Sequence, residues 1–128
     1  MEPTDRKYTK QHEWAKLEGD LATVGITNYA QEQLGDIVYV ELPQPSDTLS
    51  QSEPFGIIES VKAASDLFPP ISGGVVAVNE ELVDRPELVN EDPYGDGWML
   101  KVHPGDESEM DALMTAEEYE VHLKTLEE

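Results

Sequence analysis

Hydrophobic and polar residues alternate along much of the chain, as they do in β-strands that bury one face. In residues 22–26 and 98–102 we expect the even-numbered side chains to face the core. Shorter β-rich runs lie at residues 38–42, 55–58, 67–68 and 75–78, and prolines, glycines and aspartates separate them. Short strands with regular turns predict a mainly β domain, either a sandwich or a flattened barrel.

Two short helices are expected between the strands. The hydroxyl of Thr27 can cap a helix over residues 28–34, and Gly35 would end that helix as a left-handed cap. Pro86 suits the first turn of a second helical segment, residues 86–89, because its fixed φ and missing N–H are tolerated there.

A longer helix is predicted at residues 115–126. Thr115 and Glu118 have the spacing of a capping box, in which each side chain accepts a hydrogen bond from the other residue's backbone N–H. Apolar residues follow at three- and four-residue spacing: Tyr119, Leu123 and Leu126. We expect this apolar stripe to lie on the sandwich and the acidic face of the helix to be solvated.

A weak internal repeat relates two of the predicted strands. The segment GDIVYV (residues 35–40) matches GGVVAV (residues 73–78). Such a repeat favours two half-sheets related by a pseudo-twofold axis, with the segment around residues 59–65 between the copies. Two β-rich runs can also match by chance, so the repeat serves only as support for the sandwich.

Composition narrows the classes of function. The 128 residues include 28 Asp and Glu but only 8 Lys and Arg, which gives a formal charge of −20. This charge disfavours binding to nucleic acid or to an acidic membrane, and it favours partners with basic surfaces. The sequence has no cysteine, no apolar run long enough to span a membrane and no evident secretion signal. We expect one domain over residues 1–128.

One lysine is distinguished by its position. Lys62 is the only basic residue between Lys16 and Arg85, and it lies at the tip of a predicted hairpin of about residues 59–66. An exposed turn lysine is most often merely solvated. The alternative is an attachment point, whose amine enters the pocket of a modifying enzyme and afterwards carries a prosthetic group.

Lys62 also lies within a long run of distinctive sequence, GIIESVKAASDL (residues 56–67), which is followed by PISG (70–73). Further motifs accompany it in order: YTKQHEW (8–14), VGIT (24–27), AQ (30–31), LGD (34–36), VELP (40–43), LVN (88–90), DPY (92–94), GWM (97–99) and AEEY (116–119). Together they closely resemble the glycine cleavage system H protein family of lipoyl carriers. The resemblance covers the chain from about Tyr8 to Leu123.

This resemblance implies a lipoyl-domain-like β-sandwich, also described as a flattened barrel-sandwich hybrid, and a carrier that is not itself an enzyme. In that family lipoate is joined by an amide to the hairpin lysine, here Lys62. In lipoyl domains generally, the acidic residue three before the lysine and the glycine eleven after it help the attaching enzyme. Those positions hold Glu59 and Gly73.

The resemblance also implies partners in glycine catabolism. A pyridoxal-phosphate glycine decarboxylase leaves an aminomethyl group on the oxidised lipoyl arm, and a folate-dependent aminomethyltransferase takes the one-carbon unit and releases ammonia. A dihydrolipoamide dehydrogenase then reoxidises the dithiol. A lipoate-attaching enzyme is the fourth partner, and the carrier is expected to be a monomer. The lack of cysteine suits this role, because no internal thiol can exchange with the disulfide of the arm.

The loaded arm carries an amine that would be lost to water if the arm were fully exposed. One hypothesis places the arm in a groove near His12, Glu13 and Trp14, where the Glu13 carboxylate pairs with the ammonium group. The alternative is that these residues form an ordinary strand with Trp14 in the core. The sequence alone leaves both open.

Other sites and functions are less favoured. His12, His103 and His122 lack the spacing of metal ligands, so we expect no metal site. A carrier that relays lipoate to other proteins and an unmodified acidic interaction module stay open as alternative functions. Without an evident leader, the expected compartment is the bacterial cytoplasm, or the mitochondrial matrix for a processed eukaryotic form.

Overall fold

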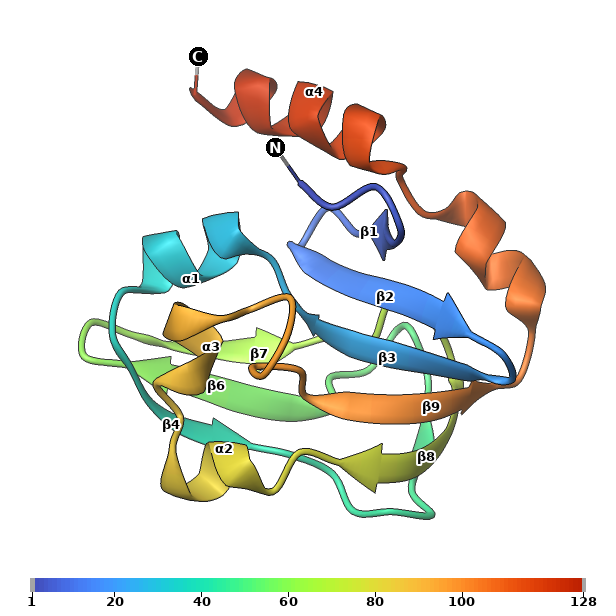
Figure 1. Ribbon diagram of the computed structural model, residues 1–128, viewed down its shortest axis with the longest axis horizontal. Coiled ribbons are helices and arrows are strands. Elements are labelled where there is room, and N and C mark those ends of the chain that lie inside the picture. The colour runs from blue at the N-terminus through green and yellow to red at the C-terminus, as the bar shows by residue number, and fades with distance from the viewer. Residues whose placement is uncertain (1, 128) are drawn as a thin grey trace.

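The computed structural model describes residues 2–127, which fold into two antiparallel sheets (Figure 1). The larger sheet contains β1 (Lys7–Tyr8), β2 (Glu13–Glu18), β3 (Leu21–Ile26), β9 (Leu100–Pro104), β8 (Gly73–Val78) and β5 (Thr48–Leu49), in that order. The smaller sheet contains β4 (Ile37–Glu41), β6 (Gly56–Ser60) and β7 (Ala64–Leu67). The predicted mainly β sandwich is therefore confirmed, and its described strands form two open sheets rather than a closed barrel.

The main core consists of the inward residues of both sheets. Ala22, Val24 and Ile26 are buried, as the alternation in β3 predicts. The prediction for residues 98 and 99 is wrong, because the strand begins only at Leu100. Met99 is fully buried in the main core, whereas Trp98 is partly buried against a separate aromatic cluster.

Helix α1 (Asn28–Leu34) begins at its predicted cap, where the Thr27 hydroxyl accepts a hydrogen bond from the N–H of Ala30 at 3.2 Å. The helix ends at Gly35, whose N–H donates to the carbonyl of Gln31 at 2.9 Å. Gly35 has φ 83° and ψ −157°. Its positive φ favours glycine, but its extended ψ corrects the prediction of a left-handed cap, because the chain turns directly into the next strand.

Two short helices, α2 (Glu81–Asp84) and α3 (Leu88–Glu91), precede β9, and a 3-10 helix η1 (Glu107–Ala112) follows it. The predicted segment 86–89 is shifted, because Pro86 and Glu87 form a turn before α3. Helix α2 was missed since its cap position makes no side-chain hydrogen bond that a sequence motif could indicate. Within residues 2–127, every helix is too short or too polar to cross a bilayer.

Helix α4 (Ala116–Glu127) has the predicted capping box. The N–H of Thr115 donates to the Glu118 carboxylate at 2.9 Å, and the N–H of Glu118 donates to the Thr115 hydroxyl at 3.2 Å. Tyr119 is buried and stacks on Tyr8 of β1, with the ring centroids 4.8 Å apart. Leu126 is exposed, contrary to the prediction, because the last turn of α4 extends past β1 (Figure 1).

The two copies of the internal repeat form one strand in each sheet, β4 and β8. Each strand has a register shift at the same point of the repeat, between Ile37 and Tyr39 in β4 and between Val75 and Ala77 in β8. The residue at the shift is an exposed valine in both strands, Val38 and Val76. A shared bulge at matching residues supports the pseudo-twofold relation between the sheets.

Candidate functional site

Lys62 lies in the turn between β6 and β7, which together form a hairpin. Ser60 closes this turn, because its N–H donates to the carbonyl of Ala63 at 2.8 Å. The Ser60 hydroxyl also accepts the N–H groups of Lys62 and Ala63, both at 3.1 Å. A short turn whose backbone groups are paired in this way gives the lysine a rigid support.

The hairpin tip is also fixed to the segment that enters β4, since the N–H of Val61 donates to the carbonyl of Asp36 at 3.0 Å. The exposed Lys62 side chain extends over Gly35. A Cβ atom at Gly35 would lie 3.2 Å from Cε of Lys62 and 3.9 Å from its Nζ. Among the described residues, Lys62 takes part in no ion pair. Its amine is therefore accessible, and its stem passes the C-terminal end of α1.

A groove of about 180 Å³ lies between α1, the hairpin and the segment that enters β2. Its walls are formed by Gln11, His12, Glu13, Ile26, Ala30, Gln33, Leu34, Ile58, Ser65, Asp66 and Leu67. Leu34, in the wall of the groove, directly precedes Gly35, over which the lysine stem lies. The sequence prediction missed Leu34 and Asp66, because only folding brings them next to the residues that the motifs indicate.

Glu13 is the buried acid of this groove, with 3% of its surface exposed. The hydroxyl of Thr9 donates to its Oε1 at 2.7 Å, and the N–H of Phe68 donates to its Oε2 at 3.3 Å. Burial raises the pKa of Glu13 to about 7, and these two hydrogen bonds oppose part of that rise. The carboxyl group is thus poised between its neutral and charged forms near neutral pH, and a cation beside it would favour the charged form.

Trp14 lies on the other face of β2, because neighbouring residues of a strand point to opposite sides. It is buried in an aromatic cluster with Tyr8 and Tyr119. Its indole N–H donates to the carbonyl of Ile26 at 2.9 Å, and the guanidinium of Arg6 lies 4.5 Å from its ring centroid. The structure therefore brings His12 and Glu13 into the groove and places Trp14 outside it.

His12 connects the groove to helix α4. Its Nδ1 lies 2.7 Å from the hydroxyl of Tyr119, which is also 2.8 Å from the hydroxyl of Thr27. Burial, with a smaller contribution from His122, lowers the pKa of His12. The backbone of His12 has φ 75°, which is uncommon for a residue other than glycine. The wall of the groove is thus supported by the C-terminal helix.

The structure places Glu59 and Gly73 differently. Glu59 is exposed on β6, directly before the turn that contains Lys62. Gly73 is buried at the start of β8 in the larger sheet, whereas the hairpin belongs to the smaller sheet. It has φ 155°, and a Cβ atom there would collide with the carbonyl of His103. Only Glu59 therefore lies beside the lysine.

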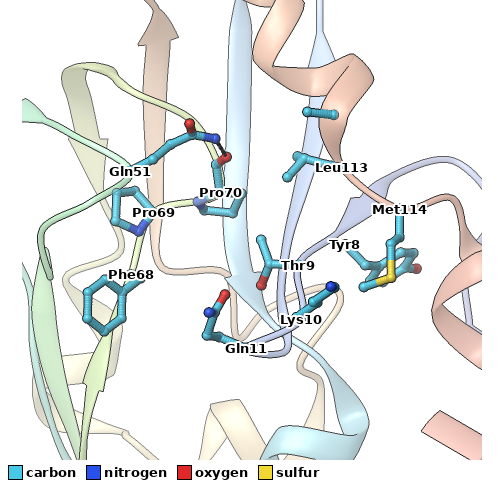
Figure 2. Close-up of a pocket in the computed structure, with 11 residues that line it drawn as sticks. Tyr8, Thr9, Lys10, Gln11, Gln51, Phe68, Pro69, Pro70, Leu113 and Met114 are labelled. Atoms are coloured by element: carbon cyan, nitrogen blue, oxygen red, sulfur yellow. Dashed lines mark hydrogen bonds between the residues drawn. The ribbon is translucent and has the colours of Figure 1, made fainter. Parts of the chain in front are cut away.

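A second pocket, of about 340 Å³, adjoins the groove. In Figure 2, Phe68 to Pro70 line one side and Thr9 to Gln11 face them, while the Gln51 amide donates to the carbonyl of Pro70 at 2.5 Å. Gln11 lines both pockets, and Thr9 donates to Glu13 between them. Within residues 2–127, no cluster of three or more His, Asp or Glu residues could hold a metal ion.

A β-sandwich that presents one accessible lysine on a rigid hairpin beside a groove has the architecture of a carrier domain. The model of the family described as Glycine cleavage H-protein matches residues 6–126. The chain belongs to this family.

Individual relatives agree with this assignment. The chain is 58% identical to the glycine cleavage system H protein of Magnetococcus marinus, over 96% of this chain and 88% of that protein. It is 55% identical to the protein of the same name from Carboxydothermus hydrogenoformans, over 98% and 95% of the two chains. The crystal structure of a glycine cleavage system H protein from Mycobacterium marinum superimposes with a TM-score of 0.88 at 43% identity, covering 95% of this chain and 98% of that one.

Proposed function

We propose that Lys62 bears lipoate as an amide and that the chain thereby serves as the lipoyl carrier of a glycine cleavage system. The chain is a carrier subunit and not an enzyme in its own right, as its family membership establishes. The observation that carries the assignment to Lys62 is geometric. The amine is accessible at the tip of a closed turn, and its stem lies across Gly35, the residue that follows Leu34 of the groove wall.

Attachment of lipoate forms an amide at Lys62 and removes the charge of its amine. The unprotonated Nζ attacks the carboxyl carbon of an activated lipoate, the bond to the activating group breaks, and the amine loses a proton as the amide forms. The amide at Lys62 carries no charge, so the amide is the only polar group of the lipoyl-lysine arm. The apolar wall formed by Ile26, Leu34 and Ile58 fits such an arm.

When attached, lipoate supplies a dithiolane that accepts the aminomethyl group of glycine and passes it on. The partners would be the pyridoxal-phosphate glycine decarboxylase, the folate-dependent aminomethyltransferase, dihydrolipoamide dehydrogenase and the lipoate-attaching enzyme. The charge of −20 would steer encounter with basic partner surfaces. Since the relatives are bacterial, we place this cycle in the bacterial cytoplasm.

We further propose that the loaded arm folds back into the groove, where Glu13 pairs with the cationic amine. A carboxyl group whose pKa is about 7 when the groove is empty is ready to ionise when a positive charge arrives. His12 supports the same wall through Tyr119. Glu59, beside the turn, would contact the attaching enzyme directly. Gly73 would act at a distance, by allowing the close approach of β8 and β9.

The attachment is tested by intact and peptide mass spectrometry of protein isolated from its native host. We expect a lipoyl amide on Lys62, and we expect exchange of the glycine carboxyl group with bicarbonate to be lost in Lys62→Arg. Lys10→Arg, which alters another exposed lysine, serves as the control and should retain exchange. An unmodified Lys62 in cells replete with lipoate would favour the acidic interaction module. A lipoylated protein without exchange activity would favour the lipoate relay.

A further inference from the structure

The two copies of the repeat share a bulged valine but differ at the residue that follows it. The bulged valines, Val38 and Val76, have similar exposures of 53% and 49%. The next residue is Tyr39 in β4, which is 47% exposed, but it is Ala77 in β8. The strand beside the lysine hairpin thus carries a large exposed aromatic side chain that its counterpart lacks.

Tyr39 lies close to the turn that contains Lys62. It is the direct cross-strand partner of Glu59, so the two side chains share the outer face of the small sheet. Val61, in the turn itself, is 67% exposed and is bound through its N–H to the segment entering β4. Figure 1 shows the hairpin tip and the beginning of β4 at the same edge of the molecule. We call the surface made by Val38, Tyr39, Glu59, Val61 and Lys62 the hairpin face.

The hairpin face combines apolar groups with negative charge. Three side chains are apolar or aromatic, and exposed carboxylates accompany them on the small sheet at Glu41, Glu59 and Asp66. Lys62 is the only basic residue between Lys16 and Arg85, and attachment of lipoate removes its charge. A matching partner surface has an apolar socket for a tyrosine and a basic rim. Tyrosine is among the residues that most often supply the binding energy of an interface.

We propose that the hairpin face is the surface by which the lipoate-attaching enzyme recognises this chain, with Tyr39 as its main anchor. This inference rests on the proposed attachment at Lys62. An enzyme that modifies the Lys62 amine must enclose the tip of the hairpin, and the β4 residues next to the tip are continuous with that contact. Two arguments therefore favour the lipoate-attaching enzyme as the partner: the hairpin face adjoins the amine that this enzyme must reach, and its charge fits a basic partner surface.

The repeat supplies matched controls for the experiment. Unmodified protein is incubated with the lipoate-attaching enzyme, lipoate and ATP, and the rate of lipoylation is followed by mass spectrometry as a function of carrier concentration. We expect Tyr39→Ala, which introduces the residue of the other copy, to lower kcat/KM about tenfold through KM. Val38→Ala should lower it less. Val76→Ala, at the matching bulge of β8, should leave it unchanged, and thermal unfolding should show that all variants are folded.

The outcomes distinguish this inference from the function on which it rests. Wild-type protein that takes up no lipoate would overturn the attachment site and the hairpin face together. If Tyr39→Ala is lipoylated as rapidly as the wild-type protein, the proposed role of the hairpin face is wrong, but the attachment site at Lys62 stands. The inference would also fail if Tyr39→Ala were lipoylated normally but lost glycine–bicarbonate exchange, because the surface would then belong to the decarboxylase.

Discussion

The two faces of strand β2 contrast sharply at neighbouring residues. Glu13 points into a groove and is a buried acid with two hydrogen-bond donors and a raised pKa. Trp14 points the other way into an aromatic cluster, where its one polar group is fully paired. Both side chains are almost completely buried. Burial of the Trp14 ring stabilises the fold, whereas burial of the Glu13 carboxylate costs free energy because the charged group loses its hydration.

This difference indicates how the chain divides stability from function. The Trp14 face buries large apolar surfaces and attaches helix α4 through Tyr119. The Glu13 face keeps a carboxyl group in an environment that disfavours its charge, which weakens the fold at neutral pH. Under the proposal above, the cationic amine of the loaded arm would offset this cost. Four experiments can break or sharpen this comparison.

The largest effect is expected from Trp14→Ala. Removing this buried indole leaves a cavity and two unpaired carbonyl groups, at Ile26 and Pro93. We expect a loss of about 3–5 kcal/mol in the free energy of unfolding, measured with urea. Trp98→Ala, at the partly buried rim of the same cluster, should lose much less. Equal losses of unfolding free energy in the two variants would contradict the claim that Trp14 forms the core of the aromatic cluster.

The Glu13 face should appear in the pH dependence of stability. The unfolded carboxyl group has a pKa near 4.5, and the folded one has a pKa of about 7, so the folded state holds more protons between these values. Stability therefore falls as pH rises through this window, by up to about 3 kcal/mol from this residue. Urea unfolding of wild type and Glu13→Gln from pH 4.5 to 8 should show curves that converge at low pH. Parallel curves would mean that burial does not perturb Glu13.

A smaller effect is expected from Gly25→Ala. Gly25 pairs with Trp14 across β2 and β3, and a Cβ atom there would lie 2.7 Å from Cζ2 of the indole. The ring is held by its neighbours, so we expect a cost of about 1–3 kcal/mol in unfolding free energy. Gly74→Ala is the control, because its Cβ would meet open space. A stability equal to that of Gly74→Ala would show that the aromatic face is loosely packed.

Local sequence signals predicted the features that depend on few residues. The Thr27 cap and the capping box of Thr115 and Glu118 follow from spacing within four residues. The exposed turn lysine follows from its position between two short β-rich runs. Alternation likewise located the buried residues of β3. The repeat at residues 35–40 and 73–78 predicted two related half-sheets, although its bulges could not be seen in the pattern.

The missed features depend on tertiary contacts. Met99 and Trp98 exchanged their expected roles because β9 begins two residues later than the alternation suggests, at Leu100 and not at residue 98. The groove needs Leu34 of α1 and Asp66 of the hairpin beside Glu13, and no motif relates these positions. Trp14 was grouped with Glu13 because the two are adjacent in sequence, whereas a strand sends adjacent side chains to opposite faces.

The most direct test of the account is the rate at which ammonia is lost from lipoylated protein loaded with the aminomethyl group. Glu13→Gln removes the carboxylate from the groove, and Glu59→Gln removes an exposed carboxylate beside the turn as the matched control. The account predicts faster release of ammonia from Glu13→Gln and a wild-type rate from Glu59→Gln. A wild-type rate in Glu13→Gln would contradict the claim that this face of β2 holds the loaded arm.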